Sequence, residues 1–159
     1  MKKIKIVLTA ILCTFLLAGC NQAKDVEKTA KEDLTKIEET VKADVEKTEE
    51  FSKEKIEEAV NYIHQNVEKM KDANVTKKVY EYCVYLEAAA KKAGVTVEHD
   101  VLKLATTTKE HAVKIYTAAE GEVEALVKGC VDGLKTQIDY FKTDSKNLAD
   151  EFHKLLKGE

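Results

Sequence analysis

The sequence predicts an all-α protein, an elongated antiparallel bundle of about three helices, one short and two long, behind a cleaved signal peptide. Three observations support this fold class. The 159 residues contain no proline and only six glycines, which is typical of long helices and unlike turn-rich β proteins. Apolar residues recur at intervals of three and four over long stretches. The stretches are joined by short connections, which favours antiparallel neighbours in one domain over residues 26–157.

The first segment of the chain has the features of an export signal. Lys2, Lys3 and Lys5 give it a positively charged start. The run Ile6–Leu17 that follows is mostly apolar and has the length of a signal peptide's hydrophobic region, which is too short to serve as a membrane-spanning anchor. We therefore expect this segment to direct export.

The segment ends in Leu17-Ala18-Gly19-Cys20, which resembles the lipobox of bacterial lipoproteins. The resemblance implies that Cys20 receives a diacylglyceryl group and that cleavage before it removes residues 1–19. Residues 20–25 would then form a lipidated N-terminus and tether, held in the membrane by two or three acyl chains. Asn21 stands where inner-membrane lipoproteins tend to have Asp. It implies the outer membrane in a cell with two membranes, and otherwise the outer face of the plasma membrane.

The charge of the remaining chain argues against a nucleic-acid partner. Loss of Lys2, Lys3 and Lys5 would change the formal net charge from −3 to −6, whereas nucleic-acid binders present a basic face. Every basic residue is Lys. The absence of Arg removes the side chain that most often forms bidentate contacts with phosphates and carboxylates.

A long first helix is predicted from Ala23 to Lys71. Its apolar positions follow a 4-4-3 spacing, and the last position of this eleven-residue repeat is occupied in turn by Leu34, Val45, Ile56 and Val67. Eleven residues over three turns correspond to 3.67 residues per turn, so the apolar stripe runs nearly straight. At about 1.5 Å per residue the helix would be a rod of roughly 70 Å.

The first half of this apolar stripe is thin, because Ala, Val and Thr dominate it. We expect the residues near Cys20 to form a partly solvated or disordered stalk, with firm packing from about Phe51 to Tyr62. Over residues 24–67 the period and the Lys/Glu/Ala/Thr/Val composition resemble the exchangeable apolipoproteins and the group-three late-embryogenesis-abundant proteins. This resemblance implies a lipid-binding role as an alternative.

A second, shorter helix is predicted from Thr76 to Lys92, ended by Gly94. Residues 79–86 are rich in β-forming residues, but a strand is rejected because one helical face is apolar and no partner strand exists elsewhere. Three tyrosines, Tyr80, Tyr82 and Tyr85, wrap around this helix, so at most two are expected in the core. An exposed tyrosine here would be a candidate contact for a protein partner.

The third predicted helix runs from Val97 to Leu156, with Thr96 as its cap, and lies back along the first. Three glycines inside it indicate either a bend or a close helix crossing. These glycines are Gly121, Gly129 and Gly133.

The sequence indicates no catalytic or metal site. The four histidines are scattered singly, and the nearest ligand-like spacing is His64 with Glu68, one helical turn apart. A structural zinc site needs four ligands and a catalytic one three. No glycine-rich phosphate loop or nucleophile motif occurs, so no cofactor is expected. The histidines are His64, His99, His111 and His153.

Two further cysteines, Cys83 and Cys130, lie on apolar faces of helices that should be neighbours. An exported protein can form a disulfide in an oxidising compartment. Buried free thiols that act as small hydrophobic groups are equally compatible with the pattern. The sequence leaves these two alternatives open.

Together these features predict a non-catalytic, lipid-anchored helical protein of the cell envelope or surface. We expect it to bind the membrane through its N-terminal lipid and to act by contact with a protein partner or with itself. The alternative is a lipid- or hydrophobe-binding protein whose amphipathic helices open to expose their apolar stripe. An enzyme is not expected.

Overall fold

The structure, a computed structural model, describes residues 21–96 and 98–159, so Cys20 and the export signal lie outside the described residues. Every regular element in this part of the chain is helical, which confirms the all-α fold class. The elements are α2 (Asn21–Lys47), α3 (Lys53–Asn66), the 3₁₀ turn η1 (Val67–Lys69), α4 (Ala73–Lys92), α5 (Asp100–Thr117) and α6 (Glu120–Lys157).

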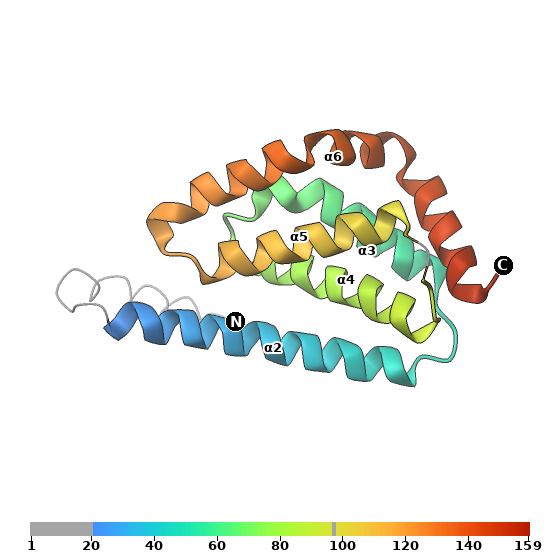
Figure 1. Cartoon of the computed structure of the whole chain (residues 1–159), viewed down its shortest axis with the longest axis horizontal. Coiled ribbons are helices and arrows are strands. Elements are labelled where there is room, and N and C mark those ends of the chain that lie inside the picture. Colours follow the sequence, from blue (N-terminus) through green and yellow to red (C-terminus); the bar gives the residue numbers. More distant parts are fainter. Residues whose placement is uncertain (1–20, 97) are drawn as a thin grey trace.

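Four of these helices form a closed ring. Helices α3, α4, α5 and α6 each pack against two neighbours, and α3 returns to α6 to complete the circuit. Successive helices run in opposite directions (Figure 1), as short connections require. We call this unit the four-helix ring. Helix α2 lies outside it, and its main contacts are with α4 and α5.

Helix α4 lies at the centre of the packing, because it is apolar around most of its circumference. Its start is capped by Asp72, whose side chain accepts from the backbone N–H groups of Asn74 and Val75. It ends at Lys92, and Gly94 follows in the left-handed conformation at φ 69°, which favours glycine. The predicted end is confirmed, and the start lies three residues earlier than predicted. Its buried residues are Thr76, Val79, Tyr80, Tyr82, Cys83, Val84, Tyr85, Leu86, Ala89 and Ala90.

The prediction of one continuous helix from Ala23 to Lys71 is wrong. The chain leaves the helix after Lys47 and enters α3 at Lys53; we call residues 48–52 the α2–α3 connection. Ser52 has extended φ and ψ angles of −72° and 130°, and its hydroxyl accepts from the backbone N–H of Lys55 at 3.2 Å. The reversal lets the apolar faces of α2 and α3 both reach α4, which a single rod could not do.

The predicted third helix is also two helices. Ala118 and Ala119 both have extended backbone angles, so the chain turns between α5 and α6. The start of α5 is capped by His99, whose Nδ1 accepts from the backbone N–H of Val101 at 3.1 Å, rather than by Thr96. The predicted bundle of about three helices therefore has five α-helices in residues 21–96 and 98–159. Its last helix lies opposite α2, not along it (Figure 1).

The three glycines of α6 mark neither a bend nor a close crossing. A Cβ atom added at Gly121, Gly129 or Gly133 would meet nothing within 4 Å. The irregular position of α6 is Asp144, with φ −132° and ψ 18°. The prediction that these glycines allow tight helix packing is therefore wrong.

Residues 24–29 of α2 are exposed, with Val26 45% exposed, as expected for a solvated stalk near Cys20, but the helix packs against the core further along. Leu34 and Val45 of α2 are buried, and Ile37 and Val41 between them are half-buried against the same core. Firm packing thus begins well before Phe51. Across the described residues, none of the helices is both long enough and apolar enough to cross a membrane.

Replacing Gly129 or Gly133 by Ala should stabilise the protein. Both lie in regular helix with open space around Cβ, so alanine gains about 0.5 to 1 kcal/mol at each position by restricting the unfolded chain. Thermal unfolding should show a higher Tm for each variant and an additive gain for the double variant. A lower Tm would contradict the open surroundings of these residues.

Candidate functional site

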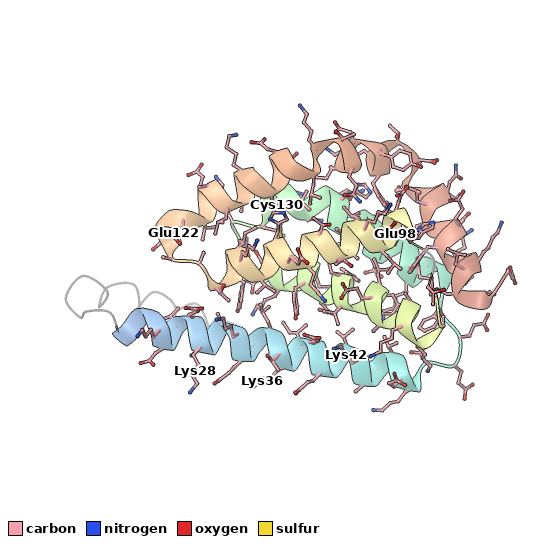
Figure 2. The ribbon with its side chains drawn as sticks, in the orientation of Figure 1. Lys28, Lys36, Lys42, Glu98, Glu122 and Cys130 are labelled. Atoms are coloured by element: carbon pink, nitrogen blue, oxygen red, sulfur yellow. The ribbon has the colours of Figure 1, made fainter. Side chains whose placement is uncertain are left out.

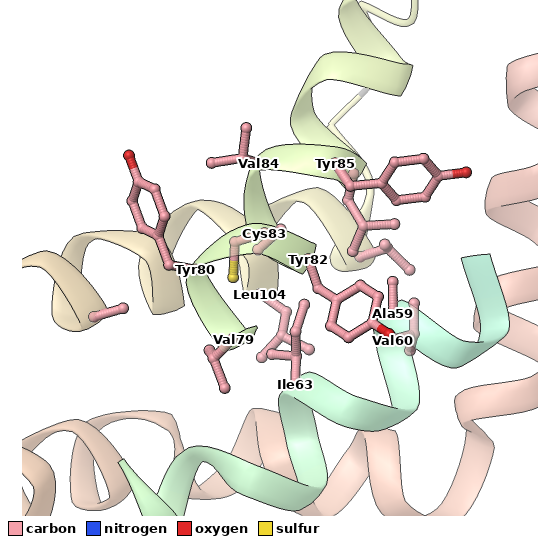
Figure 3. Packing of buried hydrophobic residues seen from close by; sticks show 14 of the residues in the cluster. Ala59, Val60, Ile63, Val79, Tyr80, Tyr82, Cys83, Val84, Tyr85 and Leu104 are labelled. Carbon is pink, nitrogen blue, oxygen red and sulfur yellow. The ribbon is translucent and has the colours of Figure 1, made fainter. Parts of the chain in front are cut away.

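The three tyrosines of α4 all lie inside the protein. Tyr80, Tyr82 and Tyr85 are only 4, 5 and 5% exposed, so the prediction that at most two could be buried is wrong. They leave α4 in three different directions (Figure 3). A third tyrosine fits because α2 covers a side of α4 that two neighbours alone would leave open. The three side chains therefore contact helices of this chain.

Each buried tyrosine has a charged partner. The Tyr80 hydroxyl donates to Glu38 Oε2 of α2 at 2.9 Å, and the Tyr82 hydroxyl donates to Glu58 of α3. The Lys55 ammonium lies 4.7 Å from the centre of the Tyr85 ring, a cation–π contact. Burial, followed by the adjacent carboxylates, raises the pKa of Tyr80 and Tyr82 well above 10. Both hydroxyls therefore remain proton donors.

We call the contact of α2 with α4 and α5 the α2 seam. Besides its aliphatic residues it contains two hydrogen bonds from tyrosine to carboxylate, Tyr80 to Glu38 and Tyr116 of α5 to Asp33 at 3.3 Å. Lys42 forms an ion pair with Glu38 and is the main cause of its lowered pKa. Burial, and then Asp33, raises the pKa of Tyr116 to about 12. The seam is thus held by oriented polar contacts as well as by apolar area.

Lys92 closes the C-terminal end of α2 from another helix. Its Nζ donates to three backbone carbonyls, those of Val45 at 3.0 Å, Glu46 at 2.6 Å and Thr48 at 2.6 Å. The Val45 and Glu46 carbonyls belong to the last turn of α2 and the Thr48 carbonyl follows it, at the end of a helix where carbonyls lack i+4 donors and the helix dipole favours a cation. The end of α4 therefore fixes where α2 stops.

The α2–α3 connection is tied to the end of α6. Phe51 is 9% exposed, and its carbonyl is 2.9 Å from Nε2 of His153. Glu50 forms an ion pair with Lys157 at 3.1 Å, and Lys53 forms one with Asp150 at 2.8 Å. These contacts join residues about 100 positions apart in sequence and hold the chain reversal in place.

The predicted cysteine pair lies in the core as two free thiols. Cys83 of α4 and Cys130 of α6 are both completely buried, and Cys130 lies inward from α6 (Figure 2). Burial raises the pKa of the Cys130 thiol to about 11 and that of Cys83 well above 9. The thiolates needed for disulfide exchange or metal binding are therefore disfavoured at neutral pH.

Three of the histidines, His64, His99 and His153, make structural contacts in this fold. His64 is buried with Nε2 3.1 Å from Asn61 Oδ1, and burial lowers its pKa below 6.5. His99 caps α5, and His153 binds the Phe51 carbonyl. Residues 21–96 and 98–159 contain no group of three or more His, Cys, Asp or Glu side chains that could hold a metal ion.

The outer surface carries charges of both signs. Along α2, Lys31 pairs with Glu27 at 2.5 Å, and Lys28 and Lys36 project away from the bundle (Figure 2). Exposed pairs of this kind contribute little to stability, but they keep the surface hydrated. Comparison of the chain with protein-family models, with curated proteins and with solved structures finds no significant match.

Replacing Tyr80 by Phe should destabilise the α2 seam. The change removes the hydroxyl that donates to Glu38 but keeps the ring, so we expect a loss of about 1 kcal/mol in the free energy of unfolding. The matched control is Tyr140→Phe, because Tyr140 is 45% exposed and should stay within about 0.5 kcal/mol. Urea unfolding followed by circular dichroism measures both. Equal stability of the two variants would show that the Tyr80 hydrogen bond contributes nothing.

Proposed function

We propose that the protein is a non-catalytic, lipid-anchored helical protein of the bacterial envelope or surface that acts through protein–protein contact. The observation that carries this proposal is that the apolar faces of the helices meet one another. Ile56 and Ile63 of α3 are fully buried and Ile138 of α6 is 2% exposed. A lipid or hydrophobe binder of the alternative class must expose these same residues, whereas a contact protein keeps them inside.

The position of the anchor supports the same role. Helix α2 begins at Asn21, directly after the lipobox cysteine, and the α2 seam then fixes it along the ring. The start of α2 lies at one end of the molecule, while the C-terminus and the α2–α3 and α4–α5 connections lie at the other (Figure 1). A lipid on Cys20 would therefore hold the first end at the membrane and present the second end to a partner.

The lipid anchor is tested by replacing Cys20 with Ser in cells that express the full chain. The variant should lose metabolic labelling by fatty acids and should not be processed normally, because the acylated thiol is absent. Cys13→Ser is the matched control, since Cys13 precedes the predicted cleavage site, and it should be labelled as the parent is. Unmodified Cys20 in mature protein, seen by mass spectrometry, would contradict the anchor.

The alternative function is lipid binding by an opened α2. One observation favours this function: among residues 24–47 of α2, only Leu34 and Val45 are buried. The outer face of α2, however, carries many carboxylates, and anionic lipid headgroups repel them.

We expect the unlipidated chain from residue 24 to remain in solution when mixed with anionic vesicles at about 0.15 M salt, where the Debye length is near 8 Å. Flotation of the vesicles measures bound protein, and circular dichroism measures any gain of helix. Co-flotation of the protein with the vesicles would favour the lipid-binding function over the contact function.

A further inference from the structure

The local sequence gives only one signal for the break between α2 and α3, which is the Ser52 cap of α3. Residues 48–52 read Thr-Glu-Glu-Phe-Ser and contain neither glycine nor proline. The eleven-residue helical repeat continues through them in register, with Val45 and Ile56 at equivalent positions on either side. Glutamate is a good helix former. The local sequence therefore favours a continuous helix, and tertiary contacts impose the bend.

Those tertiary contacts lie at two places: Lys92 of α4 binds the carbonyls where α2 ends, and the others lie at the end of α6. The burial of Phe51, the His153 contact to its carbonyl and the Glu50–Lys157 ion pair hold the α2–α3 connection against the end of α6. Ser52 adds its cap to α3. The bend and the straight helix are thus two competing conformations of residues 48–52.

Helix α2 is also the element that can leave without opening the four-helix ring. The four-helix ring closes through contacts among α3, α4, α5 and α6 alone. Removing α2 would uncover one side of α4, including Tyr80, and would leave Glu38 and Asp33 without their tyrosine donors. The surface of α4 and α5 that α2 would leave fits another copy of α2.

We propose that two copies of the chain exchange α2, so that residues 48–52 become helical and each α2 lies on the α4 and α5 of its partner. The proposal deepens the contact role proposed above by naming a second copy of this chain as a partner. The Tyr80–Glu38 and Tyr116–Asp33 hydrogen bonds form again between the copies. The carbonyls of Val45, Glu46 and Thr48, now capped by Lys92, gain N–H donors within the continuous helix.

Exchange of an identical element is a low-cost route to a dimer, because every contact of the seam is already selected for fit. The dimer gains helix in the connection and loses the Phe51 and Ser52 contacts of the bend. It also loses the freedom of two independent chains, so its population rises with concentration. Exchange of α2 therefore predicts a monomer–dimer equilibrium controlled by residues 48–53.

Lys53→Pro tests the proposal, because it is compatible with the bend and incompatible with the straight helix. Residue 53 is the first residue of α3, where proline is favoured. The preceding Ser52 has φ −72° and ψ 130°, the extended conformation that a residue before proline prefers. In a continuous helix the same proline would remove a hydrogen bond and clash with the preceding turn. Lys53→Ala is the matched control, since it loses the same ion pair with Asp150 but allows the straight helix.

The measurement is sedimentation equilibrium of the chain from residue 20 onward carrying Cys20→Ser, at concentrations up to about 1 mM. We expect the parent and Lys53→Ala to form dimers and Lys53→Pro to remain monomeric with unchanged helix content. Ser52→Ala removes the α3 cap in the bent form alone, so it should tighten the dimer roughly tenfold or more. Monomers throughout, Ser52→Ala included, would overturn the exchange, and so would equal dimerisation of the folded Lys53→Pro and Lys53→Ala chains.

A distance measurement decides the matter if Lys53→Pro does not fold. Spin labels at Lys36→Cys and Gln65→Cys, both exposed positions, should be about 44 Å apart in a straight helix and much closer across the bend, where α2 and α3 run in opposite directions (Figure 1). The labelled chain is diluted with unlabelled chain so that only pairs within one copy contribute. The short distance in a dimer would overturn the exchange. None of these results depends on acylation, so a failure of the exchange and a failure of the lipid anchor are separate outcomes.

Discussion

The burial of α4 on nearly every side is the constraint from which the rest of the arrangement follows. A helix with an apolar circumference must be covered all round, and three helices do this here: α3, α5 and α2. Helix α6 then covers the remaining apolar faces of α3 and α5 and closes the ring. The tyrosines of α4 orient two of these contacts, because Tyr80 binds Glu38 of α2, and Tyr82 and Tyr85 contact Glu58 and Lys55 of α3.

Sequence periodicity predicted the helical class, and Gly94 predicted the end of α4. Neither predicted the number of helices. Gly94 marks a helix end through its own backbone freedom, so the signal is local. The reversals at residues 48–52 and at Ala118–Ala119 lack glycine and proline, and the apolar period continues through both. The reversal at residues 48–52 is held by contacts such as Phe51 with His153, which join residues 102 positions apart. A period read along one segment contains no information about such contacts.

The candidate sites also differ in whether local sequence could predict them. The lipidation proposed at Cys20 was predicted from four adjacent residues, and Cys20 lies outside the described part of the chain. The α2 seam depends on pairs such as Tyr116 and Asp33, 83 positions apart, and on Lys92 binding carbonyls 44 to 47 positions earlier. A lysine in the last turn of a helix is expected to interact with its own helix end, so nothing in the sequence distinguishes one that caps another helix.

The course of α2 along the ring has a mechanical consequence for an anchored protein. Tension between a lipid on Cys20 and a partner at the opposite end would act parallel to the α2 axis. The two tyrosine–carboxylate bonds and the Lys92 contacts are spread along that axis, so they would be stretched in shear and would share the force. Peeling α2 from one end would load the same bonds one at a time and would need less force. The attachment is therefore strongest in the direction in which a surface-anchored protein is pulled.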